Sequence, residues 1–318
     1  MKKFVEAALG ELLVDFTENG ISTQGNPVLE VNPGGAPCNV LSMLQNLGKS
    51  TAFIGKVGDD VFGRMLADAV KTQGINTDNL VVDPEVHTTL AFVHTKKDRE
   101  FSFYRNPGAD MMLRWEEVQQ EKLAQTRIFH FGTLSMTHEQ VKDATQRAVQ
   151  HARKEGALIS FDPNLRPPLW NSLEDAARQM WYGIGQCDIL KISDDEIAFL
   201  TGKKDIDQGI AEILRKNRPI LICATMGKYG SKAYYQGKSV FCEPFLRDDT
   251  IETTGAGDTF MACVLNAVLE KGLDSLTEDD LHEMLRFANA ASSIITTRKG
   301  ALKVMPKREE IISVLIKE

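Results

Sequence analysis

The sequence predicts an α/β fold with a mainly parallel central sheet and helices on both of its faces. Three short apolar runs, 157–164, 188–193 and 219–227, do not alternate in polarity, and helix-like segments separate them. Such runs are typical of parallel strands that are buried on both sides. The length of 318 residues, with 42% hydrophobic residues, favours one large domain over two equal ones.

Two other regions, 11–33 and 88–105, alternate in polarity around polar turns and predict antiparallel hairpins. We therefore expect a single domain over 1–318 whose hairpins form a small lid, with segments at about 11–33 and 88–110. The pattern of 231–245 predicts a third hairpin, with Gly237 and Lys238 at its tip.

Composition excludes several classes of protein. The net charge is -7, the isoelectric point is about 5.5 and no long basic run occurs, so we expect no nucleic-acid partner. No apolar run is long enough to span a membrane, and Glu6 and Glu11 interrupt the N-terminal apolar segment, which is unlike a signal peptide. Five scattered cysteines without a C-x-x-C pair indicate reduced thiols and a cytoplasmic protein. No H-x-x-x-H pair suggests zinc, and no P-loop motif is present.

Two glycine-rich loops each lead into a helix, one near each end of the chain. Gly34 and Gly35 precede a helical pattern whose first turn carries Asn39. The stretch TTGAGDTF, 253–260, places Asp258 in the first turn of a second helical pattern. A well-capped helix after a turn would explain either junction alone.

The two junctions together favour a function. Backbone N–H groups at helix N-termini bind anions, and a carboxylate beside them can accept a proton from a hydroxyl group while a phosphoryl group is transferred. Further polar residues follow the predicted strands, and in parallel sheets these strand ends bind ligands. They are Asp162, Asn164, Ser193 and Thr225, the last beginning a T-x-G-x-x-G pattern with Gly227 and Gly230.

Five stretches, in order, resemble the ribokinase-like (PfkB) carbohydrate kinases: NPGGAPCNV, GKVGDDVFG, FDPNLR, KISDDEIAFLTG and ETTGAGDTF. Within that family, GELLVDF, GGAPCNV, FYRNPGADMML and LKISDDE are most similar to fructokinases. The resemblance covers nearly the whole chain. It implies a ribokinase-like three-layer α/β/α fold with a small β-hairpin lid.

The resemblance also implies roles for individual residues in phosphoryl transfer. Asp258 would be the catalytic base, an anion hole would surround the transferred group, and Arg166 would face the phosphates. The anion hole would consist of Gly255, Ala256 and Gly257. The sugar-binding residues would be Asp15, Gly34, Gly35, Asn39, Arg105 and Asn164.

The nucleotide and metal sites follow from the same resemblance. The nucleotide, ATP, would lie along Lys191, Ser193, Thr225, Gly227, Gly230 and Asn289. Glu196 would organise Mg²⁺ through water. A K⁺ site would lie under the anion hole, formed by Glu252 and Thr254 with the backbone from Ile295 through Arg298 to Gly300.

The sequence departs from the family pattern at three positions. Ser193 replaces the Asn of the N-x-x-E motif, Cys38 replaces a small Ala, and Glu252 replaces the usual Asp of D-T-T-G-A-G-D. The longer side chain of Glu252 leaves the potassium dependence open.

The function that this resemblance implies is a fructokinase, which transfers the γ-phosphate of ATP to the 6-hydroxyl of D-fructose. The same chemistry on 2-keto-3-deoxygluconate, ribose or a nucleoside is an alternative, because lid residues choose the acceptor. A non-catalytic sugar sensor is a second alternative. A nicotinamide dehydrogenase is disfavoured, since no G-x-G-x-x-G follows the first strand. We also expect a homodimer formed through the lid, because its strand edges would be exposed.

Overall fold

The computed structural model describes residues 4–94 and 100–317, and its centre is a nine-stranded sheet with the order β13-β12-β11-β10-β9-β8-β1-β4-β5. All neighbouring strands are parallel except that β12 pairs antiparallel with β11 and β13. The three predicted parallel strands are confirmed as β9, β10 and β11. The strands are β1 (Phe4–Leu9), β4 (Thr51–Gly58), β5 (Asn76–Asp83), β8 (Thr126–Gly132), β9 (Leu158–Asp162), β10 (Ile189–Ser193), β11 (Leu221–Thr225), β12 (Ser231–Tyr235) and β13 (Lys238–Cys242).

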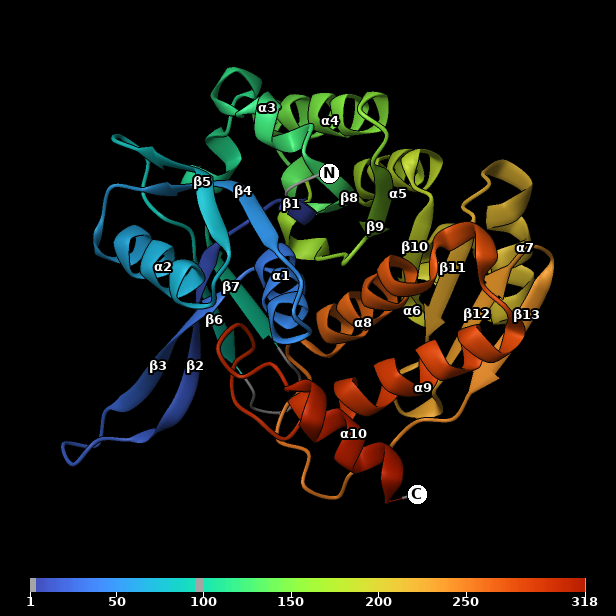
Figure 1. The fold of residues 1–318 in the computed structure, drawn as a ribbon. Coiled ribbons are helices and arrows are strands. Elements are labelled where there is room, and N and C mark those ends of the chain that lie inside the picture. The colour runs from blue at the N-terminus through green and yellow to red at the C-terminus, as the bar shows by residue number, and fades with distance from the viewer. Residues whose placement is uncertain (1–3, 95–99, 318) are drawn as a thin grey trace.

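Helices cover both faces of this sheet, which confirms the three-layer prediction (Figure 1). One core contains side chains of α1 (Ala36–Asn46), α8 (Ala256–Lys271), α9 (Glu278–Ile295) and α10 (Arg308–Ile316). The core on the other face contains side chains of α4 (Glu139–Lys154), α5 (Leu173–Gln186), α6 (Asp194–Thr201) and α7 (Ile206–Lys216). A third core joins α1 to α2 (Val61–Thr72), and the short α3 spans Gln120–Leu123.

Helix α8 is buried along most of its length. Eleven of its residues are buried, because it lies in the same core as α1 and α9. A helix that is apolar on nearly all sides is typical of such an interior position. Its first turn, which holds Asp258, is therefore fixed by packing over the rest of its length.

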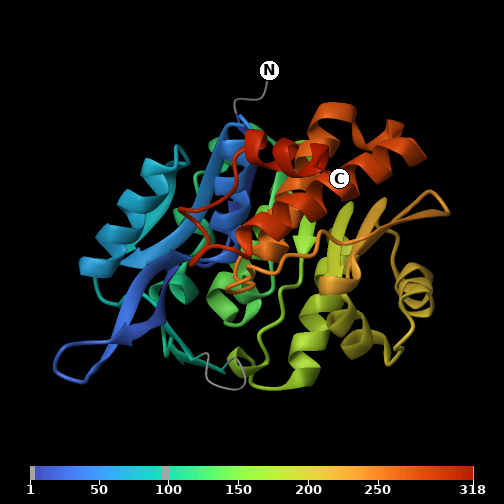
Figure 2. The same ribbon diagram turned by 90° about the horizontal axis from the view of Figure 1, so that it is seen from below.

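A second, four-stranded sheet has the order β3-β2-β6-β7 and contains the two predicted hairpins. Its strands are β2 (Leu13–Ile21), β3 (Pro27–Gly34), β6 (Leu90–His94) and β7 (Glu100–Tyr104). Strands β2 and β3 project from the body of the molecule (Figures 1 and 2). Part of the segment predicted for the second hairpin, residues 95–99, lies outside the described residues.

The third predicted hairpin extends the edge of the main sheet as β12 and β13. Its tip is Gln236-Gly237 and not Gly237-Lys238, because Lys238 already pairs with Tyr235. Gln236 and Gly237 both have positive φ, at 50° and 78°, as a tight two-residue turn requires.

All five cysteines are buried and unpaired, as the sequence predicted. Among the residues that the structure describes, no helix is both long and apolar enough to cross a membrane.

Candidate active site

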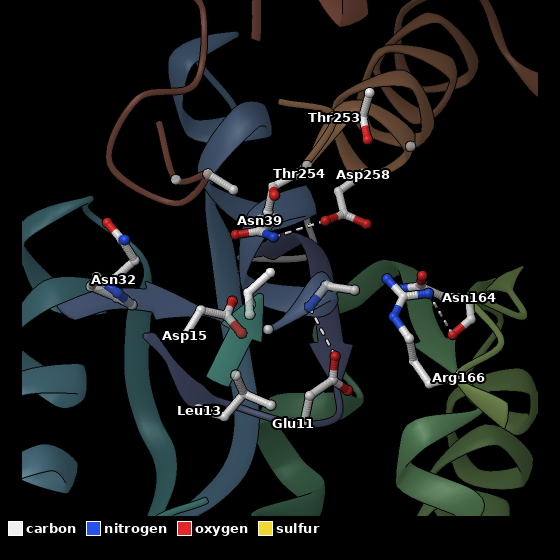
Figure 3. A pocket seen from close by; sticks show the side chains of 18 of the residues that line it. Glu11, Leu13, Asp15, Asn32, Asn39, Asn164, Arg166, Thr253, Thr254 and Asp258 are labelled. Carbon is white, nitrogen blue, oxygen red and sulfur yellow. Dashed lines mark hydrogen bonds between the residues drawn. The ribbon is translucent and has the colours of Figure 1, made fainter. Parts of the chain in front are cut away.

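A cleft of about 940 Å³ lies between the small sheet, the start of α1 and the start of α8 (Figure 3). It also reaches β10 and the segment that follows β9, so it opens at the carboxyl ends of these parallel strands. Twelve of the predicted site residues line it: Asp15, Gly35, Asn39, Asn164, Arg166, Lys191, Glu252, Thr254, Gly255, Gly257, Asp258 and Gly300.

Asp258 lies in the first turn of α8 and is only 8% exposed. Burial raises the pKa of its carboxyl to about 6. A hydrogen bond from Asn39 Nδ2 to Asp258 Oδ2, 2.8 Å long, opposes this rise, as do the charges of Lys191 and Arg166, whereas Asp162 adds to it. A carboxylate with a pKa near neutrality is suited to accept a proton from a hydroxyl group.

The loop before Asp258 presents backbone to the cleft. Gly255 is the N-cap of α8 with φ 76°, and no side chain caps the helix there. The N–H of Ala256 already donates to the backbone oxygen of Thr253 over 3.2 Å, so the neighbouring N–H groups of Gly255 and Gly257 are the ones that an anion in the cleft can bind. A Cβ on Gly255 would lie 2.8 Å from Ala301 Cβ, so both the backbone conformation and the space require glycine.

Lys191, in the middle of β10, supplies a positive charge beside this loop. A Cβ on Gly257 would lie 2.9 Å from Lys191 Nζ, so the ammonium group lies directly against the predicted anion hole. Its Nζ donates to Asp162 Oδ2 over 2.9 Å. Burial alone would lower the pKa of Lys191, but Asp162, Glu196 and Asp258 raise it above its ordinary value. Lys191 therefore stays charged in the site.

The start of α1 forms the opposite wall with Asp15 of β2. Asp15 Oδ2 fills the space next to Gly34, where a Cβ would lie only 2.1 Å from it. Gly34 itself does not line the cleft, but its lack of a side chain makes room for the Asp15 carboxylate. Asp15 and Asn39 both point into the cleft (Figure 3).

The segment after β9 brings Asn164 and Arg166 to the same space. Asn164 has φ 45°, and its N–H donates to Asp162 Oδ1, so Asp162 holds this turn. The Arg166 guanidinium donates to the backbone oxygens of Asn164 and Leu165. Both side chains line the cleft.

Arg105 does not line the cleft. It is 8% exposed and forms an ion pair with Asp110, at 2.6 Å from Nη2 to Oδ2. It also donates to Thr137 Oγ1 and to the backbone oxygen of Leu134, and Leu134 does line the cleft. In this conformation Arg105 can influence a ligand only indirectly, by positioning these neighbours.

Ser193 and Glu196 cap the start of α6 and lie outside the cleft. Glu196 Oε2 accepts from the N–H and hydroxyl of Ser193, and its Oε1 accepts from the N–H of Leu165. Within the described residues, no group of three or more His, Cys, Asp or Glu side chains could hold a metal ion.

Of the residues predicted along the nucleotide, Lys191 lines the cleft, and four others lie outside it as Ser193 does: Thr225, Gly227, Gly230 and Asn289. The Asn289 amide accepts from Ser231 Oγ and donates to the backbone oxygens of Cys242 and Glu243. A Cβ on Gly230 would lie 2.3 Å from the backbone oxygen of Cys242, which explains this glycine by packing. No such contact surrounds Gly227.

The loop around Glu252 lies next to the predicted anion hole and lines the cleft. Glu252 Oε1 accepts from the N–H of Gly300 over 2.9 Å. The backbone oxygen of Ile295 accepts from the N–H of Arg298, whose guanidinium pairs with Glu310. Glu252, Thr254 and Gly300 line the cleft, whereas Ala256, Ile295 and Arg298 do not.

The sequence did not identify several residues that line the cleft. Asn32 of β3 donates to Thr17 Oγ1 of β2, a pair that only the register of the small sheet reveals. Glu11 was read only as a break in an apolar run. The cleft residues missed in this way are Glu11, Leu13, Thr17, Asn32, Pro33, Ala36, Val93, Phe103, Leu134, Thr253 and Ala301.

Comparison with known proteins agrees with this geometry. Residues 7–308 match the pfkB family carbohydrate kinase profile. The chain is 40% identical over 317 residues to "Probable fructokinase-2" of Arabidopsis thaliana, covering 98% of this chain and 96% of that protein. It is 38% identical over 314 residues to fructokinase-1 of Zea mays, covering 98% and 97%.

A solved structure is similar over the full length. The crystal structure of a fructokinase from Xylella fastidiosa with bound ATP superimposes with a TM-score of 0.90 at 29% identity, covering 100% of this chain and 99% of that one. The fold is therefore ribokinase-like. The cleft, its buried aspartate and these relatives lead to one conclusion: the chain belongs to the pfkB family of carbohydrate kinases.

Proposed function

We propose that the protein is an ATP-dependent fructokinase that transfers the γ-phosphate of ATP to the 6-hydroxyl of D-fructose. The observation that carries the proposal is Asp258, a buried carboxylate with a pKa of about 6 at the uncapped start of α8. The fructokinase names of the relatives and the ATP in the Xylella fastidiosa structure support the substrates.

In the proposed reaction, Asp258 accepts the proton of the sugar hydroxyl as that oxygen attacks the γ-phosphorus. The bond from the γ-phosphorus to the β,γ-bridging oxygen breaks, and ADP leaves. The N–H groups of Gly255, Ala256 and Gly257 stabilise the charge on the transferred group, and Lys191 and Arg166 add positive charge. Asp15, Gly35, Asn39 and Asn164 hold the sugar hydroxyls, and Gly34 leaves the space that the Asp15 carboxylate occupies. Asn39 supports this role because it contacts the base directly.

The protein groups fit a magnesium ion that the phosphates of ATP carry. Both oxygens of Glu196 already accept hydrogen bonds from the chain, so we expect water between Glu196 and the metal. Mg²⁺ keeps several water ligands at such sites and neutralises phosphate charge. We also propose K⁺ activation through Glu252, Thr254 and the backbone from Ile295 to Gly300.

Arg105, Ser193, Thr225, Gly227, Gly230 and Asn289 remain predicted ligand contacts. Gly227 supports the nucleotide role best, since the space around it is open. Arg105 and Asn289 need other side chains to move first, because their polar groups already bind the protein.

We further propose that the chain is a single kinase domain whose small sheet closes over the cleft and excludes water. The same sheet is the proposed homodimer contact. Five apolar side chains on it are exposed, which supports an interface: Ile21, Val28, Leu29, Val31 and Tyr104. A monomer by light scattering at micromolar concentration would contradict the dimer. Five unpaired cysteines support a cytoplasmic location.

The test is coupled ADP release with ATP and Mg²⁺ over a panel of acceptors: fructose, ribose, 2-keto-3-deoxygluconate, adenosine, tagatose 6-phosphate and none. We expect strong turnover on fructose. Turnover only on another acceptor would keep the chemistry and overturn the specificity. Sugar binding without turnover on any acceptor would favour the sensor.

A further inference from the structure

Glu11 is a buried carboxylate between two cavities. It lies in the link between β1 and β2, is 4% exposed and lines the main cleft. It also lines a smaller cavity beneath, together with His130, Thr133 and Asp162. None of the ion pairs among the described residues includes Glu11. A carboxylate in this position has a specific partner or a high cost of burial.

Its partner is the start of α1. Glu11 Oε1 accepts from the N–H of Ala36, the first residue of that helix, over 2.9 Å. Gly35, the N-cap, has no side chain to do this. The backbone of Glu11 also lies close to Gly35. A Cβ on Gly35, where φ is 127°, would lie 2.3 Å from the Glu11 backbone oxygen. Glu11 therefore takes the place of a local N-cap side chain from 25 residues away.

The same helical turn reaches the proposed base. Asn39 lies three residues after Ala36 and donates to Asp258. Glu11, Asn39 and Asp258 are seen around one space in Figure 3, with Asp15 between them and the small sheet. A shift of the first turn of α1 would thus move Asn39 relative to both the sugar site and Asp258.

We propose that Glu11 is a positioning residue, whose carboxylate fixes the first turn of α1 and so sets the sugar-binding surface from Gly35 to Asn39. The inference rests on the proposed function for its kinetic readout. Glu11 acts through Ala36 and Asn39, and its role does not require contact with the phosphates.

The charge on Glu11 makes this positioning dependent on pH. Burial raises the pKa of Glu11 to about 7, and the charge of Asp110 adds to the rise. Hydrogen bonds from the backbone N–H groups of Glu11 and Ala36 and the charge of Arg105 lower the pKa in part. Because an ionised carboxylate holds an N–H more strongly than a neutral one, the first turn is best fixed above pH 7. The other titratable groups around it are Cys38, His130 and Asp162, and across the cleft Asp15, Arg166, Lys191, Glu252 and Asp258.

The kinetic test compares the wild type with Glu11→Gln, Glu11→Leu and a control, Glu85→Gln, whose side chain is exposed. KM for fructose and kcat are measured from pH 5.5 to 8.5. In the wild type, KM for fructose should fall as pH rises through 7. Glu11→Gln keeps an acceptor oxygen but no charge, so it should lose this fall and raise KM at pH 8 about 3- to 10-fold, with kcat changed less than about 2-fold. Glu11→Leu should raise KM further, and KM for ATP should stay constant.

A second measurement does not depend on turnover. The backbone amide resonance of Ala36 should titrate near pH 7 in the wild type and not in Glu11→Gln. This separates the two proposals: absence of fructose turnover would overturn the proposed substrate, and the Ala36 titration would still decide the role of Glu11. A flat Ala36 resonance in the wild type, or identical KM profiles for wild type and Glu11→Gln, would overturn the inference.

Discussion

The starts of α1 and α8 look alike in sequence but differ in what occupies them. Both follow a glycine N-cap with positive φ, Gly35 at 127° and Gly255 at 76°, and neither N-cap provides a side chain. At α1 the carboxylate of Glu11 binds the first N–H. At α8 the loop of the anion hole faces the cleft. One helix start is satisfied by an anion of the protein itself, and the other can receive the anion of a substrate.

The acids of the two junctions differ in the same way. Asp258 belongs to α8 itself and lies beside the positive charge of Lys191. Glu11 lies outside α1 and forms no ion pair with any residue that the structure describes. A glycine-rich loop before a helix therefore does not by itself identify a phosphate site. What decides is whether another part of the chain already supplies the anion.

The largest loss of activity should come from removing the proposed base, Asp258, at the start of α8. Asp258→Asn keeps the size of the side chain but cannot accept the proton, so kcat should fall about 100-fold or more. Steady-state ADP release measures this, and calorimetry with ATP should show that nucleotide binding persists. Turnover close to that of the wild type would remove Asp258 from the proposed mechanism.

The second-largest loss of activity should come from distorting the start of α8 at its N-cap, Gly255. Gly255→Ala places a side chain on a residue with positive φ and brings its Cβ too close to Ala301. We expect kcat/KM for ATP to fall about 10-fold or more. The matched control is Gly156→Ala, which has nearly the same φ, 74°, but no neighbour within 4 Å of the new Cβ. It should lose some stability and keep its activity. Equal kinetic losses in both variants would show that backbone strain alone, and not the shape of the anion hole, is responsible.

A third, smaller effect tests the link between the two helices. Because the proposed base must be ionised, kcat should rise with pH and level off above about pH 6. Asn39 holds the pKa of Asp258 down, so Asn39→Leu should move this rise to higher pH. Profiles of kcat against pH for both proteins measure the displacement. An unchanged profile would mean that another group controls the ionisation.

The smallest effect concerns stability and comes from Glu6 of β1. Glu11 accepts a hydrogen bond from Ala36, whereas Glu6 does not have such a partner in the described part of the chain. Both oxygens of Glu6 are buried without a hydrogen-bond partner among the described residues, and burial raises its pKa well above the ordinary value. The unfolded chain loses this proton near pH 4.5 while the folded chain keeps it, so stability falls as pH rises from there. Glu6→Gln should reduce this slope, to which the raised pKa values of Glu11 and Asp258 also contribute, and should raise Tm at pH 8 by a few degrees with unchanged kcat. A wild-type Tm that is flat between pH 5 and 8 would contradict the argument.

The sequence was sufficient for three of the parallel strands and for the loop after β9, because these depend on local patterns. Short apolar runs predicted β9, β10 and β11, and Asn164, which follows β9, and Lys191 of β10 both line the cleft. Asp258 and Asn39 were predicted from two distant loops, and the structure joins them with a hydrogen bond.

Other features depend on contacts that no local pattern records. The bond from Ala36 to Glu11 spans 25 residues, and the bonds of Asn289 span 46 to 58. Arg105 was predicted to bind sugar, but Asp110, only five residues later, already pairs with it. Such pairings follow from the packing of the small sheet and of α9, which the sequence does not show residue by residue.

The most direct test is a crystal structure with fructose, Mg²⁺ and a non-hydrolysable ATP analogue. We predict that the γ-phosphate lies against the N–H groups of Gly255 and Gly257, with the fructose 6-hydroxyl between it and Asp258. The start of α1 should hold the sugar and keep its bond to Glu11. A phosphate bound at the start of α1, or a fructose 6-hydroxyl remote from Asp258, would contradict the assignment of the two helix starts.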